Sequence, residues 1–395
     1  MTSTSLIATV FLAVIVMAPS ASAQDSRAAE IAAQQAEKSR RLTPVSTSRA
    51  EDTLEWLEGH ITNPNTFYLT FGGLHPSAGF APGLAVRRAV GHVRLNAGVA
   101  YSLRGYKLAQ TSLTLPELAG NRLAVETHVR WTDATQVPFY GAGNESSNDD
   151  RVSFGLRSLD VGASIALKPV PWYRIGGGIG LRRMEDRAGT GRFPSIERFG
   201  SPSMVPGLFS EARYTQTTVF TAIDWRESPG YTRSGGLYSL ALNDFTDADD
   251  RFSFRRVDAE IHQSVPLLNE HWVLAFRGRV QTTSVDSGQV VPYYLLPTLG
   301  GARMHRGYSD FRFQGRHVLL LSGEYRWLPS RVLDMALFVD AGKIANERRD
   351  LDFDDLKTAY GIGLRIHGPT FTPLRLDVAR GSEGVRVHLT GGIAF

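Results

Sequence analysis

An arginine and a few acidic residues in the last third of this sequence are the groups best suited to a specific chemical interaction. The tripeptide Arg306–Tyr308 (RGY) lies in a long connection that predicted strands flank on both sides, and the motif Phe338–Gly342 (FVDAG) follows it. A planar guanidinium group can bond two carboxylates at once, and such bonds are strongest where water is partly excluded. We therefore expect these residues to anchor a loop through charge-assisted hydrogen bonds.

The sequence carries no motif of a common catalytic or phosphate-binding site. It has no Gly-x-Ser-x-Gly elbow and no His-Glu-x-x-His pair, and the glycines at 176–178 and 180 lie in a predicted strand with no helix after it. The count of 0 Cys excludes disulfides and thiolate metal sites. The acidic stretch Asn144–Asp150 lacks the ligand spacing of a calcium loop and predicts a solvated loop. We expect no enzyme, no cofactor and no metal site.

The start of the chain predicts an export signal. An apolar run from Leu6 to Met17 is too short to span a bilayer as a helix, and the small residues Ala21–Ala23 after it fit a cleavage site. We assign residues 1–23 to a signal peptide, with a membrane anchor as the alternative. Residues 24–66 are expected to form a short periplasmic segment, partly helical over Ser26–Arg41 and Ala50–Ile61.

From residue 67 the pattern changes to strand-like segments separated by Gly, Pro, Asn, Asp and Ser. The candidates are Phe67–Gly73, Gly79–Arg88, Gly91–Tyr101, Tyr106–Leu115, Asn121–Thr132, Arg151–Leu167, Trp172–Met184, Tyr214–Arg226, Ser234–Phe245, Phe252–Val265, His271–Thr283, His317–Leu328, Leu333–Ile344, Thr358–His367, Pro373–Arg380 and Gly384–Phe395. About sixteen strands, an even number, are typical of a closed antiparallel transmembrane β-barrel. We therefore expect an all-β fold with one barrel domain at 67–395; a soluble sandwich is the alternative.

Alternation of apolar and polar residues assigns the two faces of the last strands. On the final strand Val385, Val387, Leu389, Gly391, Ile393 and Phe395 share one side, which suits lipid. The same period directs the following residues inward: Ser322, Glu324, Arg326, Asp334, Phe338, Asp340, Gly342, Gly361, Gly363 and Arg365. Three neighbouring strands thus offer lumenal carboxylates beside glycines, which leave space on the wall.

The charge balance gives no support to nucleic-acid binding. Lys and Arg number 43 against 39 Asp and Glu, and the basic residues are spread along the chain. A weak attraction to anionic lipid headgroups is the remaining expectation.

Taken together, the RGY tip, the FVDAG motif and the terminal Phe resemble the BamA/TamA-like superfamily of bacterial outer-membrane insertases and transporters, also described as the bacterial surface antigen barrel domain. In that group a long extracellular loop folds back into the barrel, and its arginine meets acids on the inner wall. The resemblance assigns the loop anchor to Arg306, Gly307 and Tyr308, its wall partners to Glu324, Phe338, Asp340, Gly342, Gly361 and Gly363, and the assembly signal to Phe395. His305 stands where the family pattern has an apolar residue. A purely structural role for the anchor, which would then only stiffen the barrel, is the alternative.

The resemblance implies a location in the outer membrane of a Gram-negative-type bacterium and contacts with its lipids and assembly machinery. Residues 24–66 are too short for a periplasmic POTRA domain, so we expect a member without them. The expected function is translocation or membrane insertion of a protein or lipid client, through a gated lumen or a lateral seam between the first and last strands. A passive solute pore is the second hypothesis, and an outer-membrane lipase is the third.

Overall fold

A computed structural model describes residues 59, 63, 65–71, 74–200, 205–267 and 271–395. The predicted signal peptide at 1–23 and nearly all of the predicted periplasmic segment at 24–66, with its helical candidates, lie outside the described residues. None of the residues described belongs to a helix long and apolar enough to cross a membrane.

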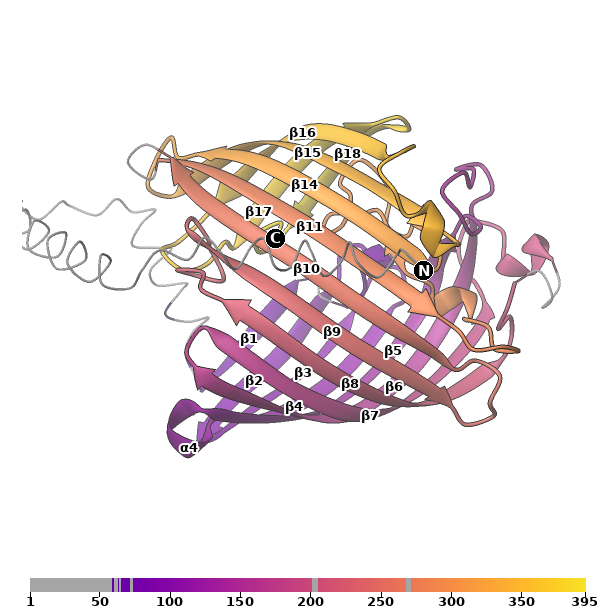
Figure 1. Ribbon diagram of the computed structural model, residues 1–395, viewed down its shortest axis with the longest axis horizontal. Coiled ribbons are helices and arrows are strands. Elements are labelled where there is room, and N and C mark those ends of the chain that lie inside the picture. The colour runs from indigo at the N-terminus through magenta and orange to yellow at the C-terminus, as the bar shows by residue number, and fades with distance from the viewer. Residues whose placement is uncertain (1–58, 60–62, 64, 72–73, 201–204, 268–270) are drawn as a thin grey trace, which may run out of the picture. The chain divides into compact units, whose positions relative to one another are not determined.

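Sixteen strands form one antiparallel sheet in which each strand pairs with its neighbours in chain order (Figure 1). They are β1 (Thr66–Phe71), β2 (Pro82–Val90), β3 (Val93–Tyr101), β4 (Lys107–Glu117), β5 (Leu123–Phe139), β6 (Val152–Val170), β7 (Tyr173–Ala188), β8 (Glu211–Asp224), β9 (Gly235–Asp247), β10 (Phe254–Leu267), β11 (Trp272–Ser284), β14 (His317–Trp327), β15 (Leu333–Ala345), β16 (Lys357–Ile366), β17 (Leu374–Gly381) and β18 (Gly384–Thr390). The predicted number and antiparallel arrangement of strands are confirmed. Within the part of the chain that the structure describes, no ladder joins β1 to β18, so closure of the sheet stays a prediction.

The remaining elements are short. They are the 3-10 helices η2 (Pro76–Ala78), η3 (Ile196–Phe199), η4 (Tyr293–Leu295) and η5 (Arg348–Asp350), the helical turn α4 (Leu118–Asn121), and the small strands β12 (Thr298–Leu299) and β13 (Phe313–Gln314). The last two pair with each other inside the long connection between β11 and β14. The predicted connection is therefore a structured insert with its own ladder.

Alternation along the strands separates an apolar outward face from a polar inward face. On β15, Leu337 and Val339 are 49% and 55% exposed, whereas Asp334 and Asp340 are buried. On β16, Tyr360 and Ile362 are exposed, whereas Arg365, which points to the other face, is buried. In water so many exposed apolar side chains would be unfavourable, but lipid accommodates them. The face assignment made from the sequence is confirmed on these strands.

The connection at residues 285–316 lies on the inward face and contacts distant strands. Tyr293 packs edge-to-face on Phe139 of β5 and Phe154 of β6, and its hydroxyl donates to Asp186 of β7 at 2.9 Å. At its other end Leu299 belongs to a buried cluster with Val318 and Leu320 of β14. Because one insert touches β5, β6, β7 and β14, the sheet curves around it.

A second insert enters from the opposite end of the strands. Neighbouring strands alternate in direction, so the turn at residues 225–234, between β8 and β9, lies at the strand ends opposite to those joined by the β11–β14 connection. Ser228 Oγ donates to Thr370 O at 3.1 Å, and Arg326 Nη1 donates to Thr232 O at 3.2 Å. Tyr231 is buried, with its ring centroid 3.9 Å from that of His367. This turn thus reaches across to β14 and to the turn between β16 and β17.

The last strand departs from the sequence prediction. β18 ends at Thr390, and Gly392 follows with a φ of +82°, a conformation that favours glycine. Phe395 faces inward: its ring centroid lies 5.6 Å from that of His262 and 5.4 Å from the guanidinium carbon of Arg326. The prediction of a strand continuing to an outward Phe395 is wrong, because the glycine pair at 391–392 turns the chain.

A substitution on the outward face tests whether that face meets lipid. Leu337→Arg would place a charge within the apolar band, and we expect a loss of about 2–4 kcal/mol in stability, measured by unfolding in lipid vesicles. Thr358→Arg, also outward but one residue from the start of β16, is the matched control. It should cost about 0–1 kcal/mol, as expected near an interface. Equal losses for the two variants would argue against a lipid-facing band.

Candidate functional site

The side chain of Arg306 lies between two buried carboxylates. Its Nε donates to Asp340 Oδ2 at 2.8 Å and its Nη2 to Asp340 Oδ1 at 2.6 Å, while Nη1 donates to Glu324 Oε1. Its backbone N–H also donates to Asp340 Oδ2 at 3.0 Å. The side chain of Arg306 is 3% exposed and both carboxylates are 0% exposed. The structure therefore brings together the arginine and the two acids that the sequence singled out.

Strand register explains how one guanidinium reaches both acids. Glu324 on β14 pairs with Phe338 on β15, and Asp340 is two residues further along β15 on the same inward face. The guanidinium carbon of Arg306 lies 3.5 Å from the centroid of the Phe338 ring. The ring thus forms the floor of the site and adds a cation–π contact to the two ion pairs.

Glu324 is the centre of a wider network of arginines. Its Oε2 accepts from Arg326 Nε at 2.7 Å and from Arg365 Nη2 at 2.8 Å. Arg365 also lies 4.0 Å from Asp334. Buried charges are tolerated only when they are paired and hydrogen-bonded. Arg306, Arg326 and Arg365 together compensate the negative charges of the acids Glu324, Asp340 and Asp334. The sequence placed Arg326 and Arg365 inward, but it did not assign them to the site.

The residues that flank Arg306 fix the tip of the connection against the last strands. A Cβ on Gly307 would lie 2.2 Å from the Cβ of Ala359, so the absence of a side chain permits close approach. Tyr308 is buried and its hydroxyl lies 3.0 Å from Ser382 Oγ. His388 Nε2 on β18 donates to Arg306 O at 2.8 Å. The tip therefore contacts β14, β15, β16 and β18.

His305 occupies the position where the family pattern has an apolar residue. Its ring is buried and packs edge-to-face on Tyr308 with centroids 4.8 Å apart. Burial lowers the pKa of His305, which favours the neutral ring, and Nε2 donates to Lys357 O at 2.7 Å. The imidazole thus fills an apolar site while its polar edge is bonded to the backbone.

The predicted wall glycines have different neighbours from those expected. Gly342 does meet the insert, because a Cβ there would lie 2.9 Å from Leu299 Cδ2. The space at Gly361 is occupied by the Phe338 ring, and the space at Gly363 by Asp377. These two glycines therefore make room for side chains of the wall itself, and the insert approaches Ala359 instead.

A second arginine, Arg312, anchors the insert and was not identified from the sequence. Its Nε donates to Glu383 Oε1 at 2.6 Å, and its Nη2 donates to Ser146 O at 2.6 Å. Lys357 Nζ donates to Glu145 at 2.9 Å. The acidic stretch at 144–150, expected to be a solvated loop, is thus partly held against the insert and β16. No group of three or more His, Cys, Asp or Glu able to hold a metal occurs among the described residues.

The profile of the Omp85 superfamily domain matches residues 92–395. The chain belongs to the Omp85 superfamily. A search of curated proteins found no match. The family assignment supports an outer-membrane β-barrel active in protein transport or membrane assembly.

Solved Omp85 structures share the fold of this chain. The crystal structure of BamA from Haemophilus ducreyi lacking POTRA domains 1-3 is 13% identical, with a TM-score of 0.62 over 83% of this chain and 70% of that one. CdiB from Escherichia coli is 13% identical, with a TM-score of 0.54 over 83% of this chain and 62% of its own. CdiB from Acinetobacter baumannii is 12% identical, with a TM-score of 0.50, over 78% and 56% of the two chains.

Removal of the anchoring guanidinium tests the role of the ion pairs. Arg306→Ala leaves Asp340 and Glu324 buried with less compensating charge, and breaking a buried pair in this way costs on the order of 3–5 kcal/mol. We expect a lower melting temperature in detergent and a lower yield of folded protein on heat-modifiability gels. Arg303→Ala, on the exposed part of the same connection, is the control and should change stability by less than about 0.5 kcal/mol. Identical melting of the two variants would contradict an anchoring role.

A double substitution tests the close approach at Gly307. Gly307→Ala adds a methyl group that would overlap Ala359, and overpacking of this kind costs about 1–3 kcal/mol. Ala359→Gly removes the opposing methyl group, so the double variant should regain part of the lost stability. The interaction energy from the four melting curves is the measurement. If the effects of the two substitutions simply add, the two residues do not meet in the folded protein.

Proposed function

We propose that this Omp85 chain inserts protein clients into the outer membrane, or passes them across it, through a lateral opening between β1 and β18. The observation that carries the proposal is that the two outer strands of the sheet, β1 and β18, are short and each pair with one neighbouring strand among the described residues. Among the described residues β1 pairs only with β2 and β18 only with β17. β1 has 6 residues and β18 has 7, whereas β6 has 19.

The inward space is a less favourable route, because two inserts occupy it. The β11–β14 connection is held by Arg306 and Arg312, and the β8–β9 turn is bonded to β14 and to the turn after β16. Moving a client through the lumen would require both inserts to leave, with the loss of several buried ion pairs. A passage at the edges of the sheet requires fewer broken contacts.

The outer edges of β1 and β18, which join no other strand in the ladders of the described residues, also specify the chemistry of the client. Exposed backbone N–H and C=O groups bind another strand by continuing the ladder, and side-chain identity matters little for that interaction. A polypeptide with strand-forming segments therefore fits the edges of β1 and β18 better than a lipid does. Protein clients are therefore the primary proposal. Lipid clients are the alternative, and profiling of outer-membrane proteins and lipids after depletion distinguishes the two.

The passive-pore hypothesis predicts a different electrical behaviour. An open lumen gives stable ohmic conductance, whereas an occupied lumen with an openable edge gives low and flickering conductance in planar bilayers. The inserts described above support the second behaviour.

For the remaining parts of the chain we propose a signal peptide at 1–23 and a periplasmic segment at 24–66, as the sequence indicates.

Cross-linking of the two edges tests the lateral opening. The chain has 0 Cys, so cysteine pairs can be placed between positions 67–70 of β1 and 385–389 of β18 and joined with a short bifunctional thiol reagent. These cross-linked variants are expressed in the native host after the original copy has been depleted. We expect them to give lower levels of outer-membrane proteins, measured by profiling the proteins of that membrane. Val378→Cys with Val387→Cys, neighbours in the β17–β18 ladder, is the control and should leave the levels unchanged. Normal levels of outer-membrane proteins in cells with the cross-linked protein would contradict the lateral opening. Unchanged levels after depletion of the protein alone would contradict the proposed function itself.

A further inference from the structure

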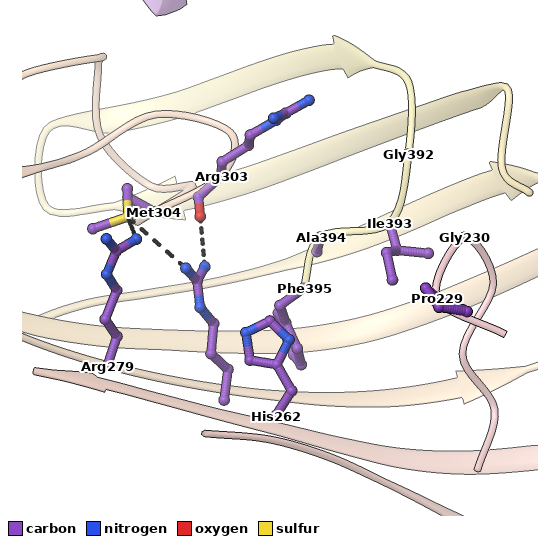
Figure 2. Close-up of a pocket in the computed structure, with 11 residues that line it drawn as sticks. Pro229, Gly230, His262, Arg279, Arg303, Met304, Gly392, Ile393, Ala394 and Phe395 are labelled. Carbon is purple, nitrogen blue, oxygen red and sulfur yellow. Dashed lines mark hydrogen bonds between the residues drawn. The ribbon is translucent and has the colours of Figure 1, made fainter. Parts of the chain in front are cut away.

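Met304 lies two residues before the anchoring Arg306 and lines a cavity on the inward side of the sheet. The cavity has a volume of about 370 Å³ and is also bordered by Gly230 of the β8–β9 turn and by Phe395 (Figure 2). Met304 is partly exposed, and it packs beside the buried cluster of Leu299, Tyr308 and related residues. Its sulfur is therefore in contact with both the insert and the open space.

Two arginines of the wall direct N–H groups at this sulfur. Arg279 Nη1 lies 3.6 Å from the Met304 sulfur (Figure 2). Arg277 Nη2 lies 4.0 Å from the same sulfur. Both guanidinium groups are held by acids of β10: Arg279 by Asp258 at 2.8 Å, and Arg277 by Glu260 at 2.6 Å. Arg279 is thus held by the wall, whereas Arg277 is held by the wall and also donates from Nη1 to Arg303 O of the insert at 2.6 Å.

A thioether sulfur is a poor partner for these donors. It is only a weak acceptor, so two guanidinium groups gain little from it. A sulfoxide oxygen is a strong acceptor on the same atom, and oxidation converts the apolar methionine into a polar side chain. An oxygen added on the side of the sulfur that faces Arg279 needs only a small shift to reach a normal hydrogen-bond distance of about 2.7–3.2 Å.

We propose that Met304 is an oxidation site, and that its sulfoxide binds Arg279 and Arg277 and holds the insert more tightly against the wall. The oxidant is a hydroperoxide such as hydrogen peroxide. The sulfur attacks one peroxide oxygen, an S–O bond forms and the O–O bond breaks, and water leaves after proton transfer. The sulfur loses two electrons and the peroxide is reduced. Methionine sulfoxide reductase reverses the change.

The surroundings of Met304 favour this reaction over the same reaction at other methionines. Met184 is 6% exposed and packs in a buried cluster with Tyr214 and Phe254, where peroxide has little access. Met335 lies on the outward face of β15, where lipid or detergent covers it. The cavity beside Met304 admits a small oxidant and leaves room for the added oxygen.

The first experiment treats the full-length protein in detergent with hydrogen peroxide and maps sulfoxide by peptide mass spectrometry. We expect Met304 to be oxidised several-fold faster than Met184 and Met335. Oxidised protein should melt a few degrees higher than reduced protein, and treatment with methionine sulfoxide reductase should restore the original melting temperature. A slower reaction at Met304 than at Met184 or Met335, or a lower melting temperature when Met304 is fully oxidised, would overturn the proposal.

Substitutions separate the effect of Met304 from oxidation elsewhere. Met304→Leu keeps the apolar shape but cannot be oxidised, so peroxide should leave its melting temperature unchanged. Met304→Gln places a carbonyl oxygen near the arginines without any oxidant and should melt higher than Met304→Leu. In Arg279→Gln the gain on oxidation should shrink. An equal gain in Met304→Leu, or a Gln variant no more stable than the Leu variant, would show that the sulfoxide–arginine contact does not form. These readouts do not depend on the client or on transport.

Discussion

The contact on which the insert depends is the one between the guanidinium of Arg306 and the carboxylates of Asp340 and Glu324. The insert also buries apolar side chains such as Tyr293 and Leu299, but apolar contacts are non-directional, so directional bonds set the position of its tip. Three N–H groups of the side chain reach two acids, and the backbone N–H of the same residue reaches Asp340 as well. Because all of these groups are buried, loss of Arg306 would leave the charge of Asp340 away from water without the guanidinium that pairs with it, whereas Glu324 would keep Arg326 and Arg365.

The strands could be predicted from the sequence because a lipid-facing surface demands apolar residues at every second position. Leu337, Val339 and Tyr360 follow this rule, and the strands that contain them were located within a residue or two. The rule fails where local backbone chemistry intervenes. The alternation after Thr390 continues in the sequence, but Gly391 and Gly392 release the chain from the sheet. β5 runs on to Phe139, past the predicted end at Thr132, with a register shift between Ala134 and Val137 that alternation does not reveal.

The candidate site was only partly predictable, since periodicity gives the side of a residue and not its partner. Arg306 and its two acids came from a family resemblance. Arg326 and Arg365 were placed inward correctly, but their convergence on Glu324 depends on the register of three strands. Arg312 and His388 bond to groups far away in the sequence, at Ser146 and at Arg306, and no spacing rule links such pairs.

The insert and the proposed opening are mechanically connected by the last hairpin. Tyr308 reaches Ser382, Arg312 bonds Glu383, and the carbonyl of Arg306 accepts from His388. All three partners belong to β18 or to the turn that precedes it, and β18 is held along its length by β17 alone among the strands described. A short edge strand with one partner is weakly fixed, so contacts from the insert contribute a large share of what keeps it in place. Release of the arginine tip would therefore loosen the strand that has to move in the proposed lateral opening, and a client pairing with that strand would compete with the insert for it.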